Sequence, residues 1–150
     1  MFERNEEATL LNTLTATLID SVNGYRDAAA DTENPQFQEL FRTMADERSR
    51  VAEELRAEVT RLGGNADDNG SVMGKVHQRF MDLKAAITGR DDKAIINEVE
   101  RGEDYLKEKF EAAMGSEHVT GETRTVIDRA YQSVREGHDR ISALKHSLTV

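Results

Sequence analysis

Apolar residues recur every three or four positions along most of this chain, which is the period of an α-helix with one buried face. Proline, glycine and short polar residues interrupt the pattern at four places. The pattern therefore predicts five helices, over about residues 6–31, 35–62, 72–88, 92–114 and 122–146. No stretch alternates apolar and polar residues as a half-buried strand does, so we expect an all-α fold.

The residues at the breaks predict how the helices connect. Asn34 can cap the second helix and Pro35 suits its first turn, while Gly63 and Gly64 end that helix. The first loop is short, so the first two helices should form an antiparallel hairpin. The stretch 72–88 would be about 25 Å long as a helix, close to the length of the bundle. We therefore predict one domain over 1–150, a ferritin-like four-helix bundle with a long crossover carrying a short fifth helix.

Composition narrows the classes of function. The chain has 150 residues, enough for one domain with a core of its own, and it has no cysteine, which excludes disulfides and thiolate chemistry. Its net charge is −9, and the basic residues are interleaved with acids, so we expect neither nucleic acid nor a membrane surface as a partner. The acidic start and the absence of a long apolar run favour a cytoplasmic protein.

Three polar residues fall on the apolar stripes, where a charge needs a partner. They are Arg48 in the second helix, Glu103 in the fourth and His138 in the fifth. Arg48 lies 13 residues after Pro35, and Glu103 lies 11 residues after Asp92. If the second and fourth helices start at the same end of the bundle, the two side chains lie within about 3 Å of the same depth.

Two interpretations of this polar layer remain open. In the first, Arg48 pairs with Glu103 in a two-bond fork and His138 completes the hydrogen bonding, with Tyr25 and Tyr131 as the nearest inward hydroxyls. In the second, carboxylate and imidazole ligands from Glu47, Glu103 and His138 bind iron or manganese.

The ion pair is the interpretation that we favour. A dinuclear bundle site needs a carboxylate from each helix and a Glu-x-x-His motif on two of them. Neither the second nor the fifth helix carries that motif. Asp20 and Asp27 lie about 200° from a core position of the first helix at 100° per residue, so we expect no inward acid there.

Several runs resemble an uncharacterised, mainly proteobacterial family of ferritin-like four-helix-bundle proteins, a domain of unknown function. The runs are residues 24–29 (GYRDAA), 62–64 (LGG), 70–71 (GS), 100–104 (ERGED) and 138–140 (HDR). The resemblance implies a ferritin-like fold and a stress-related role, without an established activity. Compared with di-iron ferritins and rubrerythrins, Glu47, Glu103 and His138 resemble ligand positions. Arg50 and Arg135 stand where that pattern needs His and Glu.

We therefore expect a non-enzymatic protein that needs no cofactor and acts by forming a homodimer or by binding another protein. The alternative is a metal-dependent oxidase or iron-binding protein. Arg48 distinguishes the two, because a fixed cation beside the proposed ligands repels a metal ion.

Overall fold

The computed structural model describes residues 2–64, 92–117, 119 and 121–149, and within these ranges the regular structure is entirely helical. Helix α1 spans Phe2–Asp31, α2 spans Pro35–Arg61, α4 spans Asp92–Met114 and α5 spans Gly121–Thr149. The all-α prediction is confirmed for these residues. Helix α1 begins four residues earlier than predicted and α5 ends three residues later. The helix predicted over 72–88 lies outside the described residues.

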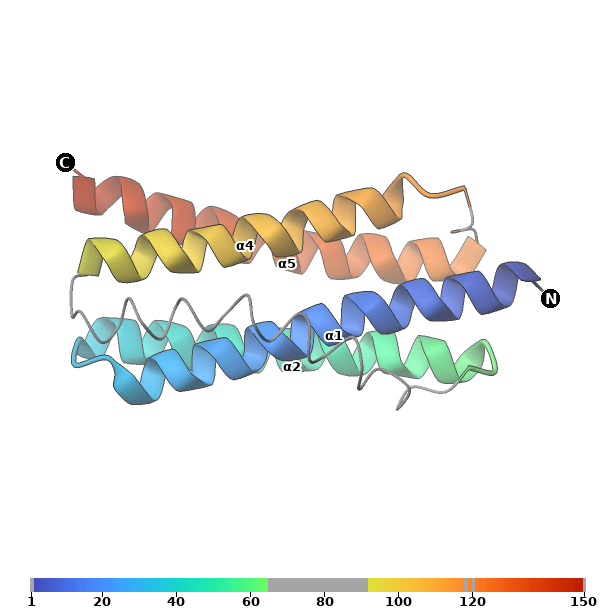
Figure 1. The fold of residues 1–150 in the computed structure, drawn as a ribbon, viewed down its shortest axis with the longest axis horizontal. Coiled ribbons are helices and arrows are strands. Elements are labelled where there is room, and N and C mark those ends of the chain that lie inside the picture. Colours follow the sequence, from blue (N-terminus) through green and yellow to red (C-terminus); the bar gives the residue numbers. More distant parts are fainter. Residues whose placement is uncertain (1, 65–91, 118, 120, 150) are drawn as a thin grey trace.

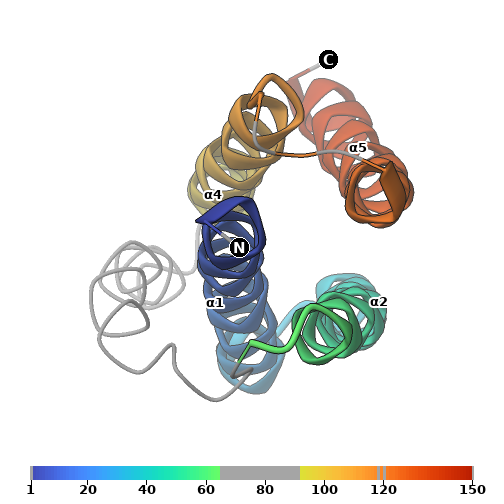
Figure 2. The same cartoon turned by 90° about the vertical axis from the view of Figure 1, so that its right-hand side faces the viewer.

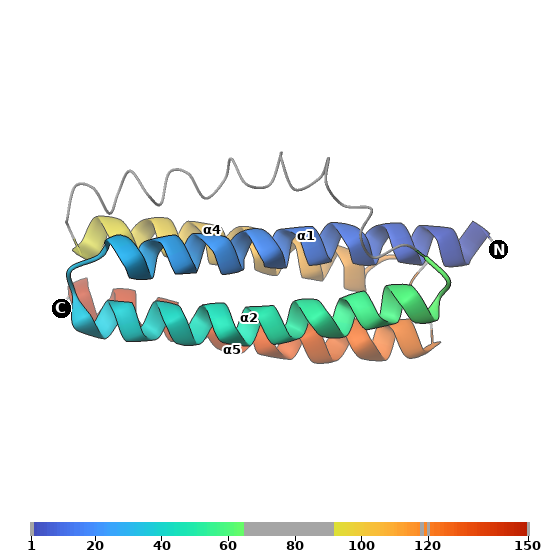
Figure 3. The same cartoon turned by 90° about the horizontal axis from the view of Figure 1, so that it is seen from below.

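The four helices pack side by side as two antiparallel hairpins, α1 with α2 and α4 with α5 (Figure 1). Helix α2 also packs against α5, and α1 against α4, so that α1 and α5 lie on one diagonal of the bundle and α2 and α4 on the other (Figure 2). Helices α2 and α4 start at the same end and run in the same direction (Figure 3). This parallel arrangement is the one that brings Arg48 and Glu103 to a common depth.

The ends of α2 follow the sequence signals. The Asn34 side chain accepts hydrogen bonds from the backbone N–H groups of Gln36 and Phe37, at 3.0 and 3.3 Å. At the other end Gly63 has φ +82°, a left-handed conformation that glycine adopts without strain. The N–H of Gly64 donates to the carbonyl of Val59, which closes the helix as a Schellman motif.

Among the described residues, the apolar core forms two separate clusters. One lies around the start of α1 and the end of α2, and includes Leu11, Leu14, Leu55, Phe110 and Ile127. The other lies at the opposite end of the bundle, and includes Tyr25, Phe37, Phe41, Ile96 and Ile141. No described helix is long and apolar enough to span a membrane.

Helix α1 is buried around most of its circumference, which the sequence did not predict. Besides its leucines, the helix buries Thr15, Thr17, Asp20 and Ser21. The hydroxyls of Thr15 and Thr17 donate to carbonyls one turn earlier, which satisfies them inside the helix. The expectation that Asp20 faces solvent is therefore wrong, because it assumed a single buried stripe.

Candidate functional site

A buried ion pair between α2 and α4 lies at the centre of the bundle. Arg48 Nη1 donates to Glu103 Oε2 at 3.0 Å, and Nη2 donates to Oε1 at 2.5 Å. Each side chain is 1% exposed. The two parallel hydrogen bonds use both carboxylate oxygens, in the bidentate geometry that arginine favours. The structure thus brings Arg48 and Glu103 together as the fork that their depth in the helices predicts.

A glycine on α5 makes room for this arginine. A Cβ atom at Gly137 would overlap the guanidinium of Arg48 and would lie 2.8 Å from Met44 Cε. Glycine inside a helix lowers stability by about 0.5–1 kcal/mol relative to alanine. At position 137 it allows the close packing of Arg48 against the backbone of α5. The backbone of α5 therefore forms one wall of the arginine site.

Tyr25 on α1 is the third member of the buried group. Its ring is 2% exposed, and its hydroxyl makes no hydrogen bond of standard geometry among the described residues. Burial, and after it the negative charge of Glu103, raises the pKa of Tyr25 well above its usual value. Burial also raises the pKa of Glu103, and Arg48 opposes that shift.

These polar groups separate the two apolar clusters. On α2, Met44 and Ala45 belong to one cluster and Val51 to the other, and Arg48 lies between them. On α4, Glu103 lies between Val99 and Leu106 in the same way. The middle of the bundle is therefore a polar layer, defined here as Tyr25, Arg48 and Glu103, with Gly137 as its wall.

His138 does not join this layer by hydrogen bonding, so that part of the prediction is wrong. Its Nε2 lies 2.6 Å from Asp104 Oδ1, and its Nδ1 lies 3.4 Å from Asp139 Oδ1. Glu103 has both oxygens on Arg48, and Asp104 is the next residue along α4. The imidazole therefore bonds to the neighbouring exposed carboxylate, and its side chain is 15% exposed.

The remaining predicted residues lie outside the layer. Tyr131 is half-buried and donates to Glu111 Oε2 at 2.7 Å, a hydrogen bond that raises the pKa of Tyr131. Glu47 is 31% exposed and lies 3.5 Å from Arg140 Nη1. The Glu47 carboxylate and the Tyr131 hydroxyl therefore bond at the edge of the bundle, although the Tyr131 side chain packs against an apolar core cluster.

The predicted metal ligands are therefore not assembled for a metal ion. Glu47 and His138 are held by Arg140 and Asp104, while the carboxylate of Glu103 is occupied by a guanidinium. Within the described part of the chain no three His, Asp or Glu side chains are grouped to hold an ion. A metal ion at Glu103 would have to displace Arg48 and then lie beside its charge.

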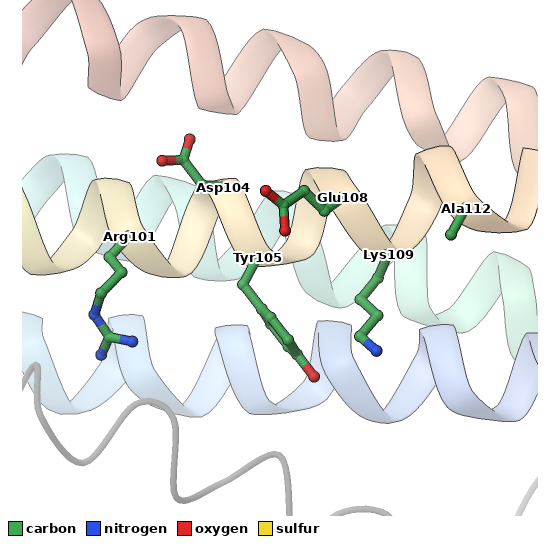
Figure 4. Close-up of a pocket in the computed structure, with 6 residues that line it drawn as sticks. All are labelled: Arg101, Asp104, Tyr105, Glu108, Lys109 and Ala112. Atoms are coloured by element: carbon green, nitrogen blue, oxygen red, sulfur yellow. The ribbon is translucent and has the colours of Figure 1, made fainter.

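A shallow depression on α4 lies next to the polar layer (Figure 4). It is lined by Arg101, Asp104, Tyr105, Glu108, Lys109 and Ala112. Asp104 points toward α5, where it meets His138, whereas Tyr105 and Lys109 extend toward α1. Lys109 Nζ is 5.3 Å from the centre of the Tyr105 ring, a cation–π distance. Four of the six lining residues are charged, unlike the residues that line most pockets for small organic molecules.

A second buried polar group joins the ends of three helices. Glu58 of α2 is 5% exposed. It accepts two hydrogen bonds from Arg61, at 2.7 and 2.6 Å, and one from Thr123 of α5 at 2.7 Å. The Thr123 hydroxyl also lies 3.4 Å from Glu7 of α1. The hydrogen bond from Arg61 is the main reason why the pKa of Glu58 is lowered.

Three residues that matter here were missed at the sequence level. Gly137 had a usable signal, because a glycine inside a helical pattern indicates close packing. Asp104 had none, since only the three-dimensional arrangement shows that it reaches His138. Thr123 gave no signal either, because its partners Glu7 and Glu58 are remote in sequence.

Comparison with known proteins adds a family but no activity. Residues 6–116 match a family model described as a domain of unknown function (DUF2383). This match covers α1 from residue 6 onward, all of α2 and α4, and both members of the Arg48–Glu103 pair. A search of curated proteins found no match.

Proposed function

The chain belongs to the DUF2383 family of domains of unknown function, and from this premise we propose that it is a non-enzymatic, ferritin-like bundle. In this proposal an ion pair replaces the metal centre that di-iron members of that fold carry. The protein then acts by association, with a second copy or with another protein, in a stress-related role in the cytoplasm. The observation that carries the proposal is the Arg48–Glu103 fork, which occupies the middle of the bundle.

The position of the fork supports the ferritin-like part of the proposal. Bundle cofactor sites are built from inward side chains on facing helices, and Arg48 and Glu103 are such residues on diagonal helices. The guanidinium supplies the positive charge that a metal ion would otherwise bring. A carboxylate on each of four helices is missing from this layer, where α1 contributes Tyr25 and α5 contributes Gly137.

Metal loading is the test of this proposal. The protein is incubated with Fe(II) or Mn(II) without oxygen, passed through a desalting column and analysed for bound metal. We expect the wild type to retain no more metal than Glu103→Ala or Glu47→Gln. Glu47 is partly exposed, so its variant should fold even if Glu103→Ala does not. Near-stoichiometric metal in the wild type that either substitution removes would contradict the proposal and favour the iron- or manganese-dependent oxidase.

Self-association has a separate test. Two-fold dimers are the commonest symmetric assembly of soluble proteins. Because the Arg48–Glu103 pair is buried, contacts with a second copy have to be made by exposed residues. We expect sedimentation velocity to detect a concentration-dependent dimer. A strict monomer at high protein concentration would exclude the homodimer and leave binding to another protein.

A further inference from the structure

We infer that a hollow between α2 and α5 binds a small phosphate-type oxyanion. The hollow has a volume of about 230 Å³ and is lined by Glu47, Arg50, Val51, Glu54, Arg129 and Ser133. Helices α2 and α5 pack against each other along this side of the bundle. The hollow is separate from the buried Arg48–Glu103 pair, and the inference does not depend on the proposed function.

Three side chains that line this hollow and can donate hydrogen bonds have no partner among the described residues. Arg50 and Arg129 are exposed and form no ion pair there, and the hydroxyl of Ser133 donates no hydrogen bond among the described residues. This contrasts with Arg101, Arg135 and Lys145, which each pair with an acid on α4 or α5. Two guanidinium groups and a hydroxyl from facing helices match the oxygens of a phosphate.

The lining of the hollow is balanced in charge, with two arginines and two glutamates, in a chain whose net charge is −9. Of the two acids that line the hollow, Glu47 is held by Arg140 at 3.5 Å. Because Arg140 engages Glu47, Arg50 and Arg129 face one further acid within the hollow, although Arg50 also borders a depression lined by Asp46, Glu53 and Glu54. Glu54 is the remaining acid, and it lies within the same exposed rim. It should weaken anion binding without preventing it.

The test is a titration of the full chain with inorganic phosphate and with glycerol 3-phosphate, followed by amide NMR shifts. We expect saturable shifts centred on Val51 and Ser133, with an affinity that falls as salt is added. Equal affinities for the two probes would identify the free anion as the ligand. Tighter binding of the ester would identify a phosphate carried on an organic group.

Four exposed positions supply variants whose effects differ in sign. Arg50→Gln and Arg129→Gln should each weaken binding about tenfold, the loss of one charge-assisted hydrogen bond. Glu54→Gln should tighten it. Arg42→Gln, also on α2 and without an ion pair among the described residues, should leave it unchanged. Absence of saturable binding for both probes, or equal effects of Arg42→Gln and Arg129→Gln, would overturn the inference.

Discussion

At the scale of single residues, Arg48 and Glu103 are each costly to bury and are tolerated because they are paired. Removing a charge from water costs several kcal/mol, which only good geometry and complete hydrogen bonding offset. The bidentate fork supplies both. The pair need not make the protein more stable than an apolar core would, but it makes each member depend on the other.

Gly137→Ala should lower the free energy of unfolding, although alanine usually stabilises a helix relative to glycine. The added methyl would overlap the guanidinium of Arg48, so either the fork or the α2–α5 packing has to shift. We expect a loss of about 1–3 kcal/mol, the usual range for overpacking a core. Urea denaturation followed by circular dichroism measures it.

Gly115→Ala is the control for this substitution. A Cβ atom at Gly115 would meet its nearest neighbours at 3.7 Å, an ordinary contact distance. Its effect should be close to zero or slightly stabilising. If Gly137→Ala were as harmless as Gly115→Ala, the wall of α5 would not constrain Arg48.

How much of the site could be predicted depended on how local each signal was. Arg48 and Glu103 were found because the face and the depth of a residue in a helix can be calculated from residue numbers alone. The partner of His138 was not, because helical periodicity places Asp104 about 100° from Glu103, outside the buried stripe, and does not show that the imidazole reaches it. The burial of Asp20 was also missed, since burial on several faces of α1 leaves no clean stripe.

At the scale of elements, the helix ends are tied together by a polar contact rather than by apolar packing alone. Glu58, Thr123 and Glu7 come from α2, α5 and α1, and Arg61 joins Glu58 to Glu122 at the start of α5, at 3.2 Å. The helix bounds at Asn34 and Gly63 were predictable because caps and glycine stops are local signals. The junction was not, because it joins residues more than 50 positions apart.

Glu58→Gln should reduce the dependence of stability on acid pH. The pKa of Glu58 is lowered in the folded state, so the charged carboxylate stabilises the protein at pH values above 4.5, the usual pKa of this group. This contribution is lost as the pH falls below that value. The difference in unfolding free energy between wild type and variant should therefore be largest near neutral pH and shrink in acid. Urea titrations between about pH 3 and 7 measure it.

Two further variants identify the cause of this pH dependence. Arg61→Gln should flatten the acid profile nearly as much as Glu58→Gln, because Arg61 is the main cause of the lowered pKa. Thr123→Val removes a weaker cause and should flatten it less. Parallel acid profiles for all three variants and the wild type would show that Glu58 does not stabilise the folded state through its charge.

At the scale of the whole molecule, the Arg48–Glu103 pair links the two hairpins, because α2 belongs to one and α4 to the other. It also separates two apolar clusters that lie in opposite halves of the bundle. A pair in this place fixes how the hairpins align along their length, since any slip leaves both charges buried and unpaired. We therefore expect its removal to affect the entire bundle rather than one helix.

The two single substitutions at this pair should differ in cost. Glu103→Leu leaves a buried arginine that cannot lose its proton, whereas Arg48→Met leaves a carboxyl that can take one up. Because burial raises the pKa of Glu103, the stability of Arg48→Met should be retained at low pH and fall as the pH rises. Glu103→Leu should show no such recovery in acid.

The decisive measurement is a double-mutant cycle at neutral pH with Arg48→Met, Glu103→Leu and the double variant, using urea unfolding. Each single substitution should cost about 3–5 kcal/mol, because it leaves an uncompensated buried charge, while the double variant should cost little more than either or even be more stable. That result is strong non-additivity. Additive effects, with a coupling energy below about 0.5 kcal/mol, would contradict the presence of an ion pair at the centre of this bundle.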